Sequence, residues 1–292
     1  MNSAPLPSAA GEKALLFLAF LFAAALGFTQ RVVSLAPGLT EIIFAVGRGD
    51  TLVGVTKFCD FPPSAKSVAK VGGFLDFNLE ALIALTPDIV VGYPEHAGKL
   101  RLLPGQIRTV LVGHKSLSDL LRSIPEIGRV LGAEIQAERL ADSLNSTLRE
   151  ISRRVAGREK IRVLLVAGRS SGELKNMFII GRGDFLNDLL AIAGGVNAYT
   201  GAVPYPSISL EAAVFLNPEF ILEVSAYHEG IPEAKILELW RPCMMVTAVA
   251  KRQIRVIRDS FWLRPGPRVG QIAAALASML HEPGDPARAV HD

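Results

Sequence analysis

A short pattern occurs twice in this chain, once in each half. The segment Phe77–Val91 is echoed by Ile208–Leu222, which begins 131 positions later, at 208 against 77. Both copies read as a helix with a polar N-cap, a proline that stops the helix and a buried strand. A chain that repeats such a helix–strand unit is expected to fold into two lobes built on one plan.

Short β-branched runs alternate with amphipathic stretches from Arg31 onwards, which is typical of α/β lobes with parallel sheets. The runs are almost entirely apolar, as expected for strands that are buried on both faces of a sheet. The strands expected are Val32–Leu35, Leu52–Thr56, Asp88–Gly92, Thr109–Val112, Ile161–Ala167, Phe178–Gly181, Glu219–Val224 and Gln253–Arg258.

A long segment without proline, Ala133–Arg158, separates the two halves. Its apolar residues, among them Ile135, Leu144 and Leu148, recur at helical spacing. We therefore predict two lobes, each with a central, mostly parallel sheet flanked by helices, joined by one long connector helix. The expected divisions are 1–30 for a signal peptide or N-terminal anchor, 31–132 for the N-terminal lobe, 133–158 for the connector helix, 159–281 for the C-terminal lobe and 282–292 for a flexible tail.

The N-terminal run Ala14–Phe28 is uninterrupted and apolar, and Lys13 precedes it. It is too short to span a bilayer comfortably and suits the apolar core of a secretory signal. We expect a periplasmic protein exported by this segment, with an uncleaved membrane anchor as the alternative. Cys59 and Cys243 fall in different halves, so we expect two free or buried thiols, with a bridge between them as the alternative.

Charge and motifs exclude several classes of function. The net charge is only +3 and the basic residues are scattered, so nucleic-acid binding has no electrostatic footprint. The chain has no phosphate-binding G-x-x-x-x-G-K-[ST] segment, which excludes ATP hydrolysis by that motif. Its histidines lack metal-ligand spacing, and we expect no intrinsic cofactor. A single axial bond to the metal of a ligand, from His96, His228 or Tyr93, is left open.

The two copies of the repeat carry a glutamate at matching positions. Asn78 and Ser209 are good N-caps, which puts Glu80 and Glu211 in the first turn of their helices. The helix dipole favours a carboxylate there by about 0.3–1 kcal/mol, so one such glutamate needs no further explanation. Matching carboxylates on two lobes could instead each accept a bidentate arginine from one half of a dimeric partner. We favour partner docking and keep helix capping as the alternative.

Aromatic residues and a proline follow the expected strands or precede the repeated helices. In an open parallel sheet the loops at the carboxyl ends of the strands line the ligand crevice. Side chains of this kind in both lobes would form an apolar wall for a large, flat or conjugated ligand. An arginine after the last expected strand could add recognition of a polar group. The predicted ligand-binding residues are Pro37, Phe58, Phe74, Tyr93, Tyr205 and Arg264.

A hydrolase is the competing class of function. Gly168–Gly172 matches the G-x-S-x-G pattern after a strand, with Ser170 as the nucleophile. The pattern requires a helix to begin directly after the serine, whereas Met177–Gly181 reads as another strand. We therefore expect no enzyme activity. A third possibility is a sensory or structural ligand-binding protein that serves no transporter.

Several short motifs, in order along the chain, resemble the helical-backbone class of periplasmic substrate-binding proteins. That class serves ABC importers of cobalamin, iron-siderophores and haem. The resemblance extends from Arg31 to about Leu280. It rests on Arg31–Pro37, Thr40–Glu41, Val53–Thr56, Cys59–Pro63, Val71–Gly73, Asn78–Glu80, Leu85–Asp88 and Ala193–Gly195.

The resemblance implies a monomer that captures a metal chelate between two lobes and delivers it to a dimeric inner-membrane permease with its ATPase. Glu80 and Glu211 match the glutamates that such proteins present to permease arginines. The cobalamin binders are most similar, which makes a corrinoid the first choice and a ferric siderophore or haem the second. Those binders carry tryptophan at some pocket positions where this chain has phenylalanine or tyrosine, so the resemblance leaves the ligand open.

Overall fold

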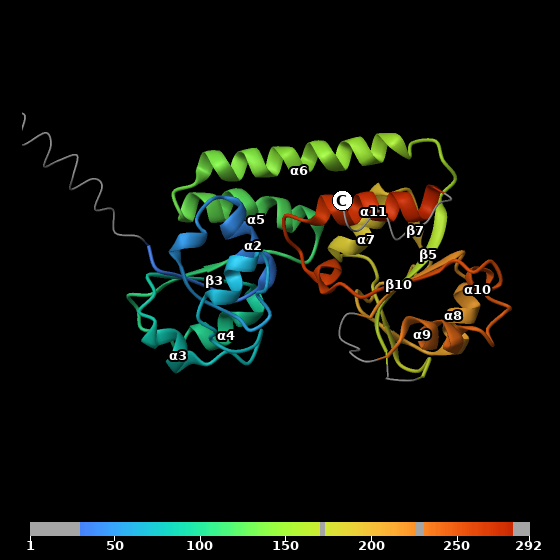
Figure 1. Ribbon diagram of the computed structural model, residues 1–292, viewed down its shortest axis with the longest axis horizontal. Helices are drawn as coiled ribbons and strands as arrows, with labels where there is room; N and C mark the ends of the chain where they lie inside the picture. Colours follow the sequence, from blue (N-terminus) through green and yellow to red (C-terminus); the bar gives the residue numbers. More distant parts are fainter. Residues whose placement is uncertain (1–29, 170–172, 226–230, 283–292) are drawn as a thin grey trace, which may run out of the picture.

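The computed structural model describes residues 30–169, 173–225 and 231–282, which form two lobes side by side (Figure 1). Each lobe surrounds its own sheet, and the long helix α6 (Glu134–Arg154) runs across the top of both. The predicted two-lobed α/β fold is therefore confirmed. The apolar N-terminal run and most of the expected tail lie outside the described residues. Within the described ranges, no helix combines the length and apolarity needed to cross a membrane.

In the described part of the N-terminal lobe, four parallel strands pair in the order β2–β1–β3–β4. The strands are β1 (Val32–Ser34), β2 (Leu52–Val55), β3 (Ile89–Gly92) and β4 (Arg108–Leu111). The connecting helices are α2 (Pro37–Ala45), η1 (Gly49–Thr51), η2 (Pro63–Ser67), α3 (Leu79–Ala84), η3 (Pro94–His96), α4 (Ala97–Leu100) and α5 (Leu117–Val130). Every residue of β1 and β3 is buried, which explains why these strands read as continuous apolar runs.

The described residues of the C-terminal lobe form a six-stranded mixed sheet in the order β10–β9–β5–β6–β8, with β7 also paired to β5. The strands are β5 (Ile161–Gly168), β6 (Met177–Ile179), β7 (Gly195–Asn197), β8 (Ser207–Ile208), β9 (Phe220–Val224) and β10 (Ile254–Ile257). The helices are α7 (Phe185–Ile192), α8 (Leu210–Leu216), α9 (Glu233–Trp240), α10 (Thr247–Ala250), η4 (Ser260–Leu263) and α11 (Val269–His281). β6 and β8 are antiparallel to their neighbours, whereas β7, β9 and β10 pair in parallel.

The connector helix does not join the lobes alone. It packs on α5 of one lobe and on α7 and α11 of the other, and a single apolar core runs through all four helices. Gly128 of α5 makes this packing close, since a Cβ there would lie 2.3 Å from the Cβ of Ala137 in α6. The backbone N–H of Leu117, at the start of α5, also donates to Asp188 of α7 across 3.0 Å. Shared burial therefore resists independent movement of the lobes.

Three details of the sequence prediction were wrong. Ile135 was expected on the buried stripe of the connector but is 61% exposed, while Ala137 is fully buried in its place against Gly128. The strands β7 and β8 were missed because runs of three and two residues are too short to show a periodic pattern.

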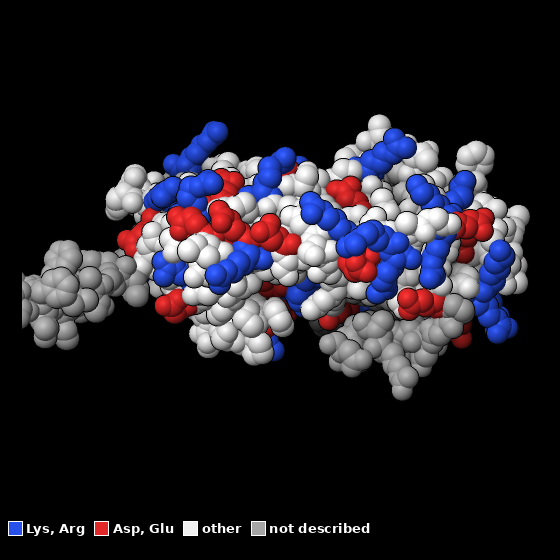
Figure 2. Space-filling model, turned by 90° about the horizontal axis from the view of Figure 1, so that it is seen from above, with Lys and Arg blue, Asp and Glu red and all other residues white. Residues whose placement is uncertain are grey.

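Charged side chains of both signs are interspersed on the face that carries α6 (Figure 2). This face thus lacks the single-sign basic surface that nucleic-acid binding requires. Cys59 and Cys243 are both free and buried, one in each lobe.

Candidate functional site

A cavity of about 470 Å³ lies between the two lobes, and both lobes contribute to its wall. In the N-terminal lobe its lining follows the carboxyl ends of the parallel strands, where the chain turns out of the sheet. Pro37 follows β1, Phe58 follows β2 and Tyr93 follows β3. In the C-terminal lobe the lining comes from the end of β5, the start of α7 and the segments around β6, β8 and η4. The volume falls within the range of about 300–1,000 Å³ that is usual for small-molecule sites.

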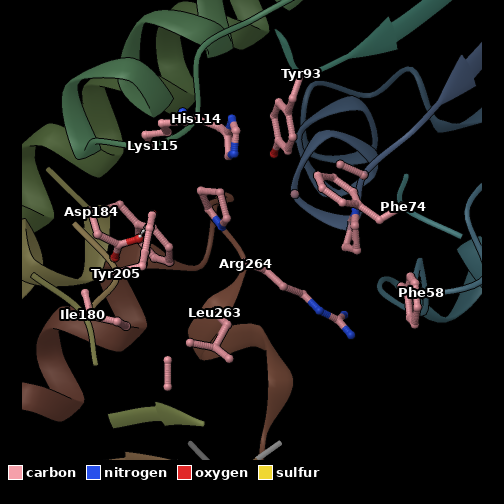
Figure 3. A pocket seen from close by; sticks show the side chains of 16 residues that line it. Phe58, Phe74, Tyr93, His114, Lys115, Ile180, Asp184, Tyr205, Leu263 and Arg264 are labelled. Carbon is pink, nitrogen blue, oxygen red and sulfur yellow. Dashed lines mark hydrogen bonds between the residues drawn. The ribbon is translucent and has the colours of Figure 1, made fainter. Parts of the chain in front are cut away.

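All six residues that the sequence predicted for the ligand site line this one cavity, although they are spread over most of the chain (Figure 3). They are Pro37, Phe58, Phe74, Tyr93, Tyr205 and Arg264.

The aromatic side chains on the N-terminal side are packed against one another. Phe74 lies 6.2 Å from Tyr93 in a tilted arrangement, measured between ring centroids. Tyr93 in turn stacks on His114, with centroids 3.8 Å apart and ring planes within 13°. Burial raises the pKa of the Tyr93 hydroxyl, so the phenol stays protonated at neutral pH. The wall is therefore pre-formed, apolar and uncharged at this point.

On the opposite side, Tyr205 is held by a buried carboxyl group. Its hydroxyl donates to Asp184 Oδ2 across 2.7 Å, and the other carboxyl oxygen accepts from the backbone N–H of Leu186, also at 2.7 Å. Asp184 is thus the N-cap of α7 and the support of a cavity aromatic at once. Burial raises the pKa of Asp184, and it also raises that of Tyr205, with a further contribution from Asp184.

Arg264 places a cationic side chain in the cavity wall, and this side chain forms an ion pair with the N-terminal lobe. Its guanidinium binds Asp60 through two contacts of 2.5 and 3.3 Å. Burial tends to raise the pKa of Asp60, but the bonds and charge of Arg264 outweigh this and lower it. Any acidic group of a ligand that reaches Arg264 therefore competes with Asp60.

A second, more deeply buried ion pair joins the lobes next to Arg264. Arg268 binds Glu41 with both arms of its guanidinium, at 2.8 and 2.6 Å, and the Glu41 side chain is only 4% exposed. The backbones meet at the same place, because a Cβ on Gly38 would lie 1.9 Å from the carbonyl oxygen of Pro265. Gly38 is thus required for the close approach of the two lobes beside the cavity.

Several cavity residues escaped the sequence analysis. His114, Lys115, Asp184 and Ile180 all contribute side chains to the wall (Figure 3). His114 follows β4 by the same strand-end rule that found Tyr93, so the signal was present but was not applied to this residue. Asp184 carried no such signal, because an aspartate before a helix reads as an ordinary N-cap.

Other polar residues near strand ends do not line the cavity or fall outside the described residues. Arg169 is buried in an ion pair with Glu223, whose second oxygen accepts from Trp240, and so does not reach the cavity. His96 is 1% exposed, and its Nδ1 accepts from the backbone N–H of Tyr93. Ser170 and His228 fall outside the described residues.

Glu80 and Glu211 are exposed near the starts of α3 and α8, and both helices lie on the side of the molecule opposite α6 (Figure 1). The expected caps are present: Asn78 accepts from Ala81 N–H at 3.0 Å, and Ser209 from Ala212 N–H at 3.3 Å. A hydrogen bond from Ser209 lowers the pKa of Glu211, which is ionised at neutral pH.

The fold and the site together define a two-lobed binding protein with its ligand cavity between the lobes. A family model described as periplasmic binding protein matches residues 32–259, and the chain belongs to this family.

Relatives and solved structures agree with that family. The chain is 30% identical over 268 residues to the uncharacterised ABC transporter substrate-binding lipoprotein YvrC of Bacillus subtilis, a match that covers 86% of this chain and 80% of the relative. It is 26% identical over 271 residues to a vitamin B12-binding protein of Pectobacterium atrosepticum, covering 90% and 92%. The structure of the apo periplasmic haem-binding protein RhuT from Roseiflexus sp. RS-1 superposes with a TM-score of 0.72 at 26% identity, covering 86% and 98%.

These relatives are transport proteins that bind a substrate, so the serine hydrolase considered as an alternative is set aside and the chain is no enzyme. Among the described residues no group of three or more His, Cys, Asp or Glu side chains is arranged to hold a metal ion.

Proposed function

We propose that this protein is the periplasmic substrate-binding component of an ABC importer and that it captures a large metal chelate between its lobes. A corrinoid is the first choice, with haem or a ferric siderophore as the alternative. The protein acts as a monomer and delivers the chelate to a dimeric permease, in which an ATPase drives transport. The observation that carries the proposal is the apolar, aromatic cavity to which both lobes contribute.

The chemistry of the cavity supports a large conjugated ligand. Phe58 and Phe74 offer apolar faces, and Tyr93 and Tyr205 add hydroxyl groups whose raised pKa values keep them uncharged. Such rings can stack on a flat π-system. The names of the relatives agree, since one is a vitamin B12-binding protein and another a haem-binding protein.

The positions of Glu80 and Glu211 support docking on a two-fold symmetric partner. Each is exposed, each lies at the first turn of the repeated helix, and the two helices lie on the same side of the molecule. Phe215 lies four positions after Glu211, and therefore on the same face of α8, with 89% of its surface exposed. An exposed aromatic beside a carboxylate suits a protein partner that brings arginine to an apolar contact.

Titration of the purified protein with cyanocobalamin, haem and a panel of ferric siderophores tests the proposed ligand class. We expect a chelate to bind saturably, and quenching of the intrinsic fluorescence of the protein measures this binding. Trp262 is buried rather than exposed in the cavity, so its quenching would come from energy transfer to an absorbing ligand. Absence of binding by every member of the panel would contradict the proposal.

Single truncations of the cavity wall test where the chelate binds. Phe74→Ala and Tyr205→Ala are each expected to weaken binding about tenfold, because each removes a stacking face worth about 0.5–1.5 kcal/mol beyond its buried area. Phe178→Ala is the matched control, since Phe178 is 54% exposed and does not line the cavity. Isothermal titration of the variants measures the change, and equal losses in all three would argue against this cavity.

A further inference from the structure

His114 is the one histidine among the described residues that lines the cavity. It follows β4, and its ring enters the cavity beside Tyr93 (Figure 3). The stack on Tyr93, at 3.8 Å and 13°, fixes the plane of the imidazole. Its side chain remains 20% exposed, so part of the ring is accessible to a ligand. From the sequence, His96 and His228 were expected as possible donors to a metal, whereas His114 was not.

The two ring nitrogens of His114 are in different surroundings. Nδ1 is buried, has no hydrogen-bond partner within the described ranges and lies 3.9 Å from Glu95 Oε2. That distance is slightly too long for a hydrogen bond, so a small shift of the ring would form one. Because the Nδ1 edge is buried, the edge that carries Nε2 is the one available to the cavity. A metal-binding histidine typically donates its other N–H to a carboxylate in this way.

The protonation state of His114 also suits metal binding. Burial lowers the pKa of its imidazole, and the nearby Glu95, which acts in the opposite direction, does not reverse this. The ring is therefore neutral at neutral pH and keeps a lone pair on one nitrogen. Neutral imidazole is the form that binds metals.

We propose that Nε2 of His114 is an axial ligand to the metal of the captured chelate. This inference rests on the proposed function and narrows it, because it requires a chelate with an open axial position. Planar four-nitrogen chelates such as haem and corrinoids meet that requirement, whereas a siderophore that fills all six positions on iron does not. The chelate itself supplies the other donors, which agrees with the absence of a cluster of metal ligands among the described residues.

The other polar groups of the cavity are poorer donors to a metal. Tyr93 is only 4% exposed, and the imidazole of His114 covers one face of its ring. Asp184 is engaged by Tyr205 and by the backbone of Leu186. Lys115 lies 3.5 Å from Glu95 and is mostly exposed, and an ammonium group has no lone pair to offer.

Ferric haem and aquocobalamin are the probes for this assignment, and optical and electron paramagnetic resonance spectra of the full chain are the readout. The wild-type complex is expected to show a nitrogenous axial ligand. His114→Phe keeps an aromatic ring on Tyr93 but lacks the nitrogen, and is expected to lose that signature and bind haem about tenfold more weakly. Phe178→Ala, which lies outside the cavity lining, is expected to retain the signature.

His114→Ala provides a second, independent arm. Added imidazole is expected to restore the nitrogenous spectrum in this variant, because the truncated side chain leaves room for it. Cyanocobalamin, whose axial positions are both filled, is expected to bind the wild type and His114→Phe with affinities within about threefold of each other. Thermal melting of the ligand-free variants checks that each is folded.

Two outcomes overturn the inference, and they differ from each other. If a chelate binds but its spectrum is the same in wild type and His114→Phe, the axial role of His114 is wrong while the proposed function stands. If no chelate binds to the wild type, the proposed function is wrong and the axial assignment falls with it.

Discussion

Replacing Glu80 and Glu211 together by arginine is expected to abolish uptake of the ligand while leaving its affinity for the isolated protein unchanged within about twofold. Both carboxylates are exposed and neither belongs to the cavity lining, so we expect no contact with the ligand. A bidentate arginine–carboxylate pair loses its attraction and meets like-charge repulsion when the carboxylate becomes a guanidinium. Two such reversals at one interface should prevent productive docking on the permease. Uptake by cells that carry the importer and titration of the purified variant give the two measurements.

A matched control uses carboxylates on the opposite side of the molecule. Glu138 and Glu150 are exposed on α6, and replacing both by arginine changes the net charge by the same amount. Uptake should survive in this control. The capping alternative predicts only a small loss of stability in each helix and no loss of transport. Normal uptake by the variant at Glu80 and Glu211 would therefore leave helix capping as the sole role of these residues.

Replacing Arg268 by methionine is expected to lower the free energy of unfolding by about 3 kcal/mol at neutral pH. The substitution leaves the carboxylate of Glu41 buried without its bidentate partner, and breaking a buried pair from one side typically costs about 3–5 kcal/mol. It also removes the cation from the rings of Phe61 and Phe261, whose centroids lie 4.3 and 4.4 Å from the guanidinium. Urea denaturation of the full chain measures the loss.

The loss in the Arg268→Met variant should depend on pH. Burial already raises the pKa of Glu41 from its ordinary value of 4.5, and the bond and charge of Arg268 oppose that rise. Without Arg268 the folded-state pKa rises further, so the folded chain binds a proton that the unfolded chain releases. Stability then falls as the pH rises from about 4.5 to the new pKa. The deficit relative to wild type is accordingly smallest near pH 4.5 and largest above the raised pKa.

Asp60→Asn is the control for the Arg268 experiment. Asp60 also pairs with an arginine of the facing lobe, but its side chain is 51% exposed. An exposed ion pair contributes only about 0–1 kcal/mol, because water screens it. Equal losses in Asp60→Asn and Arg268→Met, or a deficit that does not change with pH, would show that burial of Glu41 is not the cause.

Much of the candidate site could be predicted from the sequence, because several of its residues directly follow an expected strand. Pro37, Phe58 and Tyr93 each follow a parallel strand, and the carboxyl ends of parallel strands meet at one edge of a sheet whatever the details of packing. Tyr205 and Phe74 were found because each precedes one copy of the repeated helix. These residues were predictable because local sequence order sets their place in the sheet.

Residues that depend on contacts between distant segments were not predictable in this way. Asp184 supports Tyr205, and Glu41 meets Arg268, only because the two lobes and their loops come together. The exposure of Ile135 has a similar cause, since the close crossing of Gly128 and Ala137 sets which face of α6 is buried. A helical period indicates that one face is apolar but does not specify which residue at its edge meets a neighbour.

The sequence by itself determined that the chain forms two α/β lobes on a repeated plan, with a long helix between them and a glutamate at the same place in each. Those features follow from periodicity, helix caps and strand order, which act over a few residues. Only the tertiary structure decided that α5, α6, α7 and α11 share one core across the lobes. It also decided that His114 lines the cavity with the carboxylate of Glu95 near its Nδ1. Those features depend on side chains far apart in the chain, whose contacts exist only once both lobes have packed together.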